Sequence, residues 1–337
     1  IDQYLMRGGS IVVAGGNYVL PAEPFPTGLA VQEVSGGLRE MLSSYGVEVG
    51  QSMVFDTQNE PLPMQVPRTA GGMQVVELQE LDYPPFVDIR SDGMDKESPI
   101  VSNLPAVTMN WVSPLTIDEA KNAAREVAAL LQSTEESWLW NQTDVQPNPD
   151  LYPQYGFAIA GEQHSWPLAV SIHGSFESYF KDQASPFEAT ETMTATVEGP
   201  LGTIEASPES ARLVVIGSAE FLDDPVLQAS MQLSQDRYLN SLQFMQNAVD
   251  WSVEDEDLLS IRSRGTYARL LEPLEKGRQS FWEVLNYAVV LVALVVIGGV
   301  WTLRRQSERP MELVDPDGSE SQSENRDAET GGFHEQD

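Results

Sequence analysis

Three carboxylates lie at the end of the most apolar strand that the sequence predicts. Glu220 lies within the segment ARLVVIGSAEF (residues 211–221), and Asp223 and Asp224 follow it. Because α/β folds bind ligands at the carboxyl ends of their strands, these groups could bind Ca²⁺ or Mg²⁺. They also fit a helix start, with Asp223 or Asp224 as the N-cap and Pro225 in the first turn. We favour the cap, predict no metal, and keep a membrane-anchored metal-dependent hydrolase as an alternative.

Tryptophans form a second candidate site. Trp138 and Trp140 are separated by one residue, and Trp166 follows a polar loop. Aromatic rings at a surface can stack on sugars, so a surface module that binds glycan or peptide is another alternative. Large aromatic side chains also dominate the energetics of protein cores. Core or loop packing is therefore the interpretation that we favour for these three residues.

The remaining residue types do not form a recognisable catalytic site. The chain has no cysteine, which excludes disulfides, thiolate metal sites and cysteine nucleophiles. His164, His173 and His334 fit no zinc-binding spacing, and Ser218 lies in GSAE, which does not match the G-x-S-x-G nucleophile pattern. The glycine pairs match neither a dinucleotide fingerprint nor a P-loop. We predict that the chain is not an enzyme and has no catalytic residue and no cofactor.

One segment near the C-terminus has the composition of a transmembrane helix. Residues 287–303 read YAVVLVALVVIGGVWTL, without a charged residue. A spanning helix needs about 20 residues, and the segment reaches that length when it is extended back to Phe281. Trp282 and Trp301 lie where interfacial aromatic residues would lie, so we predict a span of about 282–303 that contacts membrane lipid. Gly298 and Gly299 are the place where another helix could approach closely.

Charge and composition limit the partners. The net charge is −32, from 51 acidic and 19 basic residues, and such a surface repels nucleic acid. We therefore predict no nucleic-acid partner. Residues 304–337 are polar and acidic without periodicity, so we expect a disordered tail. The chain begins at Ile1 rather than Met, and residues 1–9 read as the end of a helix, so we expect a fragment that lacks its N-terminal part and any targeting signal.

Hydrophobic periodicity predicts an α/β fold with a mostly parallel sheet, because buried apolar strands alternate with helices. Residues 1–115 would be the C-terminal part of an α/β domain. Residues 116–265 would be a second lobe or a continuation of the same sheet, and residues 270–303 a juxtamembrane and transmembrane helix. Predicted strands include residues 10–16, 74–81, 86–89, 106–112, 167–173, 211–221 and 258–262; predicted helices include residues 31–46 and 238–252. Residues 116–132 fit a helix, or a strand in their second half.

The predicted helix 238–252 is amphipathic. Its apolar residues Leu239, Leu242, Met245, Val249 and Trp251 lie near one face. This face would pack on the sheet.

Several segments together resemble the GldG-like auxiliary component of bacterial gliding-motility ABC transport systems. They are IDQYLMRGGSIVVAGG (1–16), FDTQNEPLP (55–63), IVSNLPAVTMNWVSPL (100–115), STEESWL (133–139), ARLVVIGSAEFL (211–222) and NSLQFMQNAVDWSVEDEDLLSIR (240–262), followed by the apolar helix. The resemblance implies a flavodoxin-like or class I glutamine amidotransferase-like fold. It also implies that a further membrane helix lies in the missing N-terminal part. The amidotransferase-like fold normally uses a cysteine nucleophile, which this chain lacks.

The resemblance also implies a role and a place in the cell. The chain would be a non-catalytic, membrane-anchored partner of an ABC permease and its ATPase. Its extracytoplasmic α/β domain would bind substrate or brace the permease. We expect the helix to cross the inner membrane once, with the acidic tail in the cytoplasm.

Overall fold

The computed structural model describes residues 1–21, 29–70, 73–183, 203–233, 237–253 and 276–307. The chain divides into two compact units, residues 1–270 and residues 271–337. Every strand described belongs to the first unit, and helix α7 (Lys276–Ser307) belongs to the second.

The central sheet of the first unit has four strands in the order β1 (Ile11–Ala14), β14 (Arg212–Ile216), β13 (Pro167–His173) and β11 (Glu126–Gln132). It joins a strand from residues 1–115 to three strands from residues 116–265. β1 and β14 are parallel, whereas β13 pairs antiparallel with both β14 and β11. The prediction of a mostly parallel sheet is therefore wrong, and the sheet is mixed. Continuous apolar runs indicate burial on both faces of a strand, but they carry no information about strand direction.

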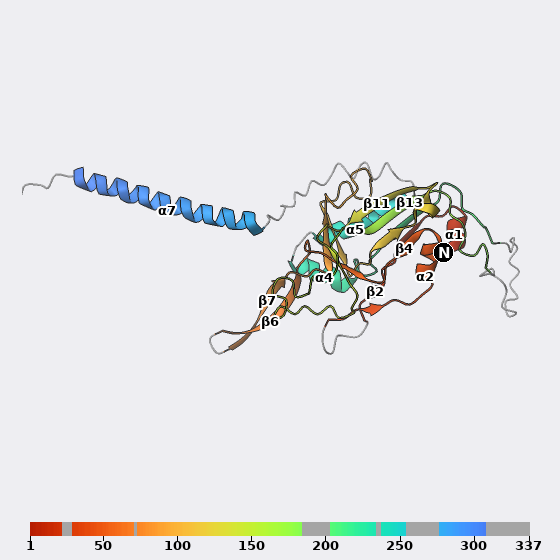
Figure 1. The fold of residues 1–337 in the computed structure, drawn as a ribbon, viewed down its shortest axis with the longest axis horizontal. Coiled ribbons are helices and arrows are strands. Elements are labelled where there is room, and N and C mark those ends of the chain that lie inside the picture. The colour runs from red at the N-terminus through yellow and green to blue at the C-terminus, as the bar shows by residue number, and fades with distance from the viewer. Residues whose placement is uncertain (22–28, 71–72, 184–202, 234–236, 254–275, 308–337) are drawn as a thin grey trace, which may run out of the picture. The chain divides into compact units, whose positions relative to one another are not determined.

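Helices cover both faces of this sheet (Figure 1). Leu213 and Val215 of β14 pack with residues of α1 (Asp2–Met6) and α2 (Leu38–Ser44). The alternate residues Val214 and Ile216 face the other way and pack with Phe244 and Ala248 of α5 (Arg237–Ser252). The period of two along each strand thus produces an α/β/α arrangement.

Shorter strand pairs surround the central sheet. They are β4 (Val47–Val49) with β10 (Leu115–Ile117), β5 (Met53–Phe55) with β12 (Trp138–Trp140), β8 (Phe86–Arg90) with β9 (Ala106–Asn110), and β2 (Tyr18–Val19) with β3 (Gln32–Glu33), all antiparallel. β5 and β12 bury an aromatic cluster in which Phe55 and Trp138 have no exposed surface.

A long hairpin projects from the first unit (Figure 1). β6 (Leu62–Ala70) pairs antiparallel with β7 (Met73–Leu81), in register from Leu62↔Leu81 to Ala70↔Met73. The prediction of a strand at 74–81 is confirmed. Its partner β6 was not predicted, because Pro63 and Pro67 interrupt the pattern that identifies strands.

Three other predictions change in detail. The helix expected over 31–46 is confined to α2, because Gly36 and Gly37 precede its first residue and Gln32–Glu33 form β3. The ambiguous segment 116–132 contains a short helix, α3 (Glu119–Asn122), and then strand β11, so the strand alternative holds for its second half. The strand predicted at 258–262 lies outside the described residues.

The helix predicted over 238–252 is confirmed as α5, but its predicted apolar face is only partly buried, because Met245 and Trp251 pack against the core whereas Leu239, Leu242 and Val249 are exposed. The buried residues of α5 are Ser241, Phe244, Asn247, Ala248 and Ser252. Two of the polar ones are held by the strand layer below, because Asn247 Nδ2 donates to the Ile100 carbonyl at 2.9 Å and Ser241 Oγ donates to the Thr108 carbonyl at 3.4 Å. Small and hydrogen-bonding residues thus share the strand-facing side of α5 with Phe244, and Leu239, Leu242 and Val249 remain exposed.

Candidate functional surfaces

The predicted carboxylates lie at the carboxyl end of β14 and at the start of α4 (Asp224–Leu233). The Leu227 N–H donates to the Asp223 carbonyl at 3.0 Å, so Asp223 stands at the beginning of this helix. Glu220 is 8% exposed, whereas Asp223 and Asp224 are exposed. In the part of the chain that the structure describes, no three His, Asp or Glu residues are grouped closely enough to hold a metal ion.

Glu220 has an unusual protonation behaviour. Burial and, to a smaller extent, the neighbouring Asp223 carboxyl raise the pKa of Glu220 to about 7, against a hydrogen bond from the Leu20 backbone. Glu220 therefore holds a proton at pH values where an exposed glutamate is ionised.

The three candidate tryptophans are packed against the protein. Trp138 has no exposed surface and meets Phe55 edge to face, with ring centroids 5.9 Å apart. Trp140 is half-buried and stacks on the same phenylalanine at 5.2 Å, while its indole N–H donates to the Asp144 carbonyl. Trp166 is half-buried and lies against the His164 ring, with ring centroids 3.7 Å apart. In this conformation Trp138 offers no face to a ligand.

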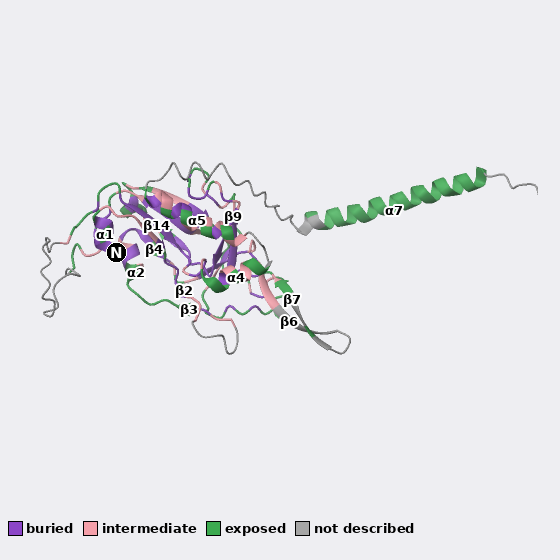
Figure 2. Cartoon of the chain, turned by 180° about the vertical axis from the view of Figure 1, so that it is seen from behind, coloured by how far each residue is buried: buried purple, intermediate pink, exposed green. Residues whose placement is uncertain are grey.

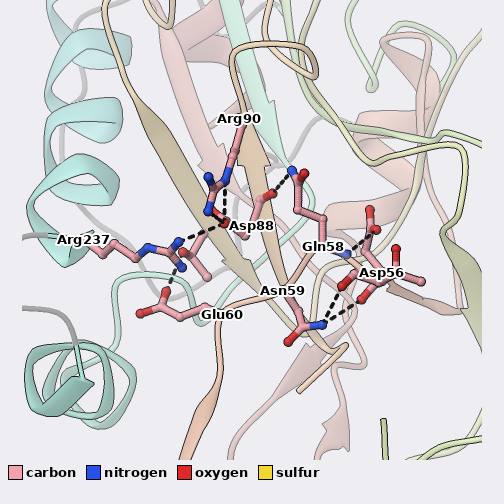
Figure 3. Close-up of polar contacts among 9 residues, drawn as sticks. Asp56, Gln58, Asn59, Glu60, Asp88, Arg90 and Arg237 are labelled. Atoms are coloured by element: carbon pink, nitrogen blue, oxygen red, sulfur yellow. Dashed lines mark hydrogen bonds and ion pairs between the residues drawn. The ribbon is translucent and has the colours of Figure 1, made fainter. Parts of the chain in front are cut away.

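A buried polar cluster lies at the base of the β6–β7 hairpin (Figure 3). Asp56 is fully buried and accepts hydrogen bonds from the Thr134 N–H and hydroxyl, both at 2.7 Å, and from the Gln58 N–H at 3.0 Å. Burial raises the pKa of Asp56, although these hydrogen bonds oppose the rise. Gln58 then donates to the Asp88 carbonyl at 2.6 Å, which ties the loop before the hairpin to strand β8.

Two further buried carboxylates complete this cluster. Asp88 is 1% exposed, and one of its oxygens pairs with Arg90 at 2.9 Å and with Arg237 at 3.1 Å. Glu60 is 4% exposed and accepts from the Thr108 and Ser230 hydroxyls. The cluster joins β8, β9, α4 and α5 to the first residues of the hairpin, so the hairpin base is held firmly in place.

The outward side of α5 carries exposed apolar residues on either side of Gln246, which is also exposed. Leu239, Leu242, Val249 and the following Val253 are 46%, 40%, 45% and 66% exposed. They recur at intervals of three, seven and four residues, so they follow one side of a helix. We call these four residues the α5 stripe; Figure 2 shows α5 with both buried and exposed residues. Exposed apolar surface that is continuous marks an interaction site more often than isolated exposed residues do.

Helix α7 is long and apolar enough to cross a membrane over Ser280–Ser307. The structure describes it from Lys276, and the predicted residues 270–275 lie outside the described part. Nothing lies within 4 Å of a side chain built at Gly298 or Gly299, so both positions are open. Arg304 and Arg305 lie in the last turn of α7.

Sequence reasoning missed the hairpin-base cluster and the α5 stripe. Asp88 and Arg237 are 149 residues apart, and no short motif links them. One signal was available for the stripe. The 237–252 segment carries apolar residues on more than one side, which is more than a helix on a single sheet needs.

The described residues thus form a mixed α/β unit and one helix that is apolar enough to span a membrane. Comparison with known families makes this more specific. Residues 1–253 match the family described as an ABC-type uncharacterized transport system, and the chain belongs to this family of ABC transport auxiliary proteins.

One similar protein is an uncharacterized protein of Borreliella burgdorferi. It is 19% identical over 303 residues, which cover 88% of this chain and 49% of that protein. This chain thus spans about half the length of the relative that it matches. No solved structure matches the chain.

Proposed function

We propose that this chain is a membrane-anchored auxiliary subunit of a GldG-like, gliding-motility-type ABC transporter, and that its first unit braces the permease outside the cytoplasm. The match of residues 1–253 to the ABC transport auxiliary family is the observation that carries this proposal. The apolar helix supports the membrane anchor.

The anchor would cross the inner membrane once. The Arg304-Arg305 pair at the end of α7 favours a cytoplasmic C-terminus, because basic residues close to a span tend to stay inside. The first unit would then lie on the opposite side. Gly298 and Gly299 would let a permease helix approach α7 closely, since small residues allow close backbone contact in membranes.

The α5 stripe would contact the permease outside the membrane. It is apolar on a protein with a net charge of −32, and it lies on the helix that directly precedes the connection to α7. Its residues are exposed, so they contribute little to the stability of the first unit. A permease or ATPase partner would explain why this helix keeps large apolar residues on its outward side.

Co-purification tests the assembly. The full chain would be expressed together with an ABC permease and ATPase of its own source organism and extracted in a mild detergent. We expect the three proteins to elute together. Elution of the chain without either partner, under conditions that keep the permease and ATPase together, would contradict the proposal.

A matched pair of substitutions tests the stripe. Leu242→Asp places a charge in the α5 stripe, whereas Leu151→Asp makes the same change at a leucine that is 63% exposed in a loop. Both should change the free energy of unfolding by no more than about 0.5 kcal/mol, as surface substitutions usually do. Only Leu242→Asp should lower the yield of the complex, by at least tenfold. Equal yields for the two variants would remove the stripe from the interface.

A further inference from the structure

The two outer edges of the β6–β7 hairpin differ in their capacity to pair. β6 contains Pro63 and Pro67, whereas β7 contains no proline. Proline has no backbone N–H, so it fits a ladder only where its nitrogen faces away from the partner strand. Both prolines therefore lie at positions of β6 that face outward. Since they are four residues apart, they belong to the same alternating set, and the outer edge of β6 has lost two hydrogen-bond donors.

The register assigns the outward positions of β7. Pro63 lies opposite Glu80, and Pro67 lies opposite Val76. Antiparallel pairs alternate between hydrogen-bonded and non-hydrogen-bonded positions, so the partners of outward-facing residues also face outward. Gln74, Val76, Leu78 and Glu80 thus direct their N–H and carbonyl groups away from β6. This edge is nine residues long and has none of the prolines or lysines that usually protect an edge strand.

Nothing in the described residues pairs with this edge. The hairpin forms a two-stranded sheet, and its other contact with a neighbouring element is that of β6 with α4. Glu60 fixes the base of the hairpin through Thr108 and Ser230. The hairpin base is therefore fixed, so the outer edge of β7 loses less conformational entropy when it binds a partner.

We propose that β7 pairs antiparallel with β7 of a second copy of this chain. The product is a four-stranded sheet in the order β6-β7-β7-β6, related by a two-fold axis. Both outer edges of that sheet are β6 strands blocked by proline, so assembly stops at two copies. A two-fold contact of this kind uses the same patch on both subunits and closes on itself. This inference is independent of the proposed role in transport.

Size and charge set the strength of the contact. Pairing of one nine-residue strand buries less than the roughly 800 Å² per partner of a stable interface. The net charge of −32 on each chain also opposes association. We therefore expect a dimer that depends on protein concentration and that strengthens when salt screens the charges.

Two register partners provide a matched test, because Gln65 of β6 lies opposite Leu78 of β7. The full chain would be kept in a mild detergent, and its mass would be measured by light scattering over a range of concentrations. Leu78→Pro removes an outward donor of β7 and should weaken dimerisation at least tenfold. Gln65→Pro makes the same change on the already blocked edge and should leave the dimer intact. Leu78→Ala, which keeps the N–H, should also stay dimeric.

The outcomes separate the proposal from its rivals. A monomeric parent chain, a dimeric Leu78→Pro variant, or loss of the dimer in Gln65→Pro would each overturn the assignment. A single cysteine offers a readout that does not disturb the backbone, because the chain has no other cysteine. Val76→Cys and Leu78→Cys should form disulfide-linked dimers under mild oxidation at least tenfold faster than Gln65→Cys. Equal rates would place the contact elsewhere.

Removing the prolines of β6 tests whether they limit the assembly to two copies. Replacing both Pro63 and Pro67 by Thr restores two outward donors on β6. The double variant should form species larger than a dimer, in proportion to concentration. A double variant that remains dimeric would show that the prolines do not limit assembly.

Discussion

Buried carboxylates occur at the hairpin base and at the end of β14, and the two regions treat their charge differently. At the hairpin base, Asp88 faces the guanidinium groups of Arg90 and Arg237, and Glu60 accepts two hydroxyl donors. At the end of β14, Glu220 faces another carboxyl, and burial raises its pKa to about 7. Asp88 and Glu220 are thus similarly buried, but the charge of Asp88 is balanced by arginines, whereas Glu220 keeps its proton up to a higher pH.

This difference indicates different roles. A buried carboxylate with cationic partners holds elements together, because removal of one partner leaves the others without compensation. A buried carboxyl beside a second carboxyl lowers stability whenever both are ionised. We therefore expect the Asp88 ion pairs to act as a structural junction, and Glu220 to make stability depend on pH near neutrality.

The largest effect is expected at the junction. Asp88→Ala removes the carboxylate oxygen that Arg90 and Arg237 share, and the side chains of these arginines are only 14% and 17% exposed. The free energy of unfolding should fall by about 3–4 kcal/mol, in the range for broken buried ion pairs. Denaturant unfolding of the full chain in detergent measures this change. Exposed Asp92→Ala on the neighbouring turn is the control, and it should have little effect.

Asp2 is a buried carboxylate whose hydrogen-bond partners are all neutral. Burial alone would raise the pKa of Asp2, but hydrogen bonds from Gln3, Tyr45, Ser178 and the Tyr179 N–H together lower it. A lowered pKa means that the ionised carboxylate stabilises the fold above its usual pKa, and that this stability is lost as pH falls through the folded value.

Asp2→Asn should therefore destabilise the chain by about 2 kcal/mol at pH 7, less than Asp88→Ala. The difference in unfolding free energy between wild type and variant should shrink as the pH falls below the ordinary pKa of aspartate, because the wild-type carboxyl then becomes neutral. A pH series of unfolding midpoints checks this. A gap that stays constant down to acid pH would mean that packing, and not charge, causes the loss.

The smallest effect should have the opposite sign. The folded pKa of Glu220, about 7, lies above its ordinary value of 4.5, so its contribution to stability is present below 4.5 and is lost as pH rises through 7. Glu220→Gln keeps the neutral state at all pH values. The variant should match the wild type at pH 4.5 and exceed it by about 1–2 kcal/mol at pH 8, a figure reduced for solvent screening.

Asp223→Asn offers the control for that result. It removes the neighbouring charge and should lower the pKa of Glu220 without removing the burial that is the larger cause. Stability at pH 8 should then lie between the values for wild type and Glu220→Gln. If Glu220→Gln is no more stable than wild type at pH 8, the contrast between the two regions fails.

The sequence predicted individual helices and strands more easily than it predicted which of them pack or pair together. The strands at 167–173 and 211–221 and the helix at 238–252 were predictable, because local periodicity reports the burial of a segment. The direction of β13 beside β14 was not predictable, because buried strands look alike in either direction. Glu220 was identified as a candidate from its place after a strand, but its raised pKa depends on packing around it.

The sequence by itself determined the apolar α7, the absence of cysteine chemistry, the acidic charge and the prolines of β6, because these are properties of a residue or of its near neighbours. Only the tertiary structure decided which side of α5 faces the strands. It also decided that Arg237 meets Asp88 and that Trp138 is enclosed by aromatic rings. These outcomes depend on contacts between residues far apart in the chain, and in each case burial and hydrogen bonding outweigh the local pattern.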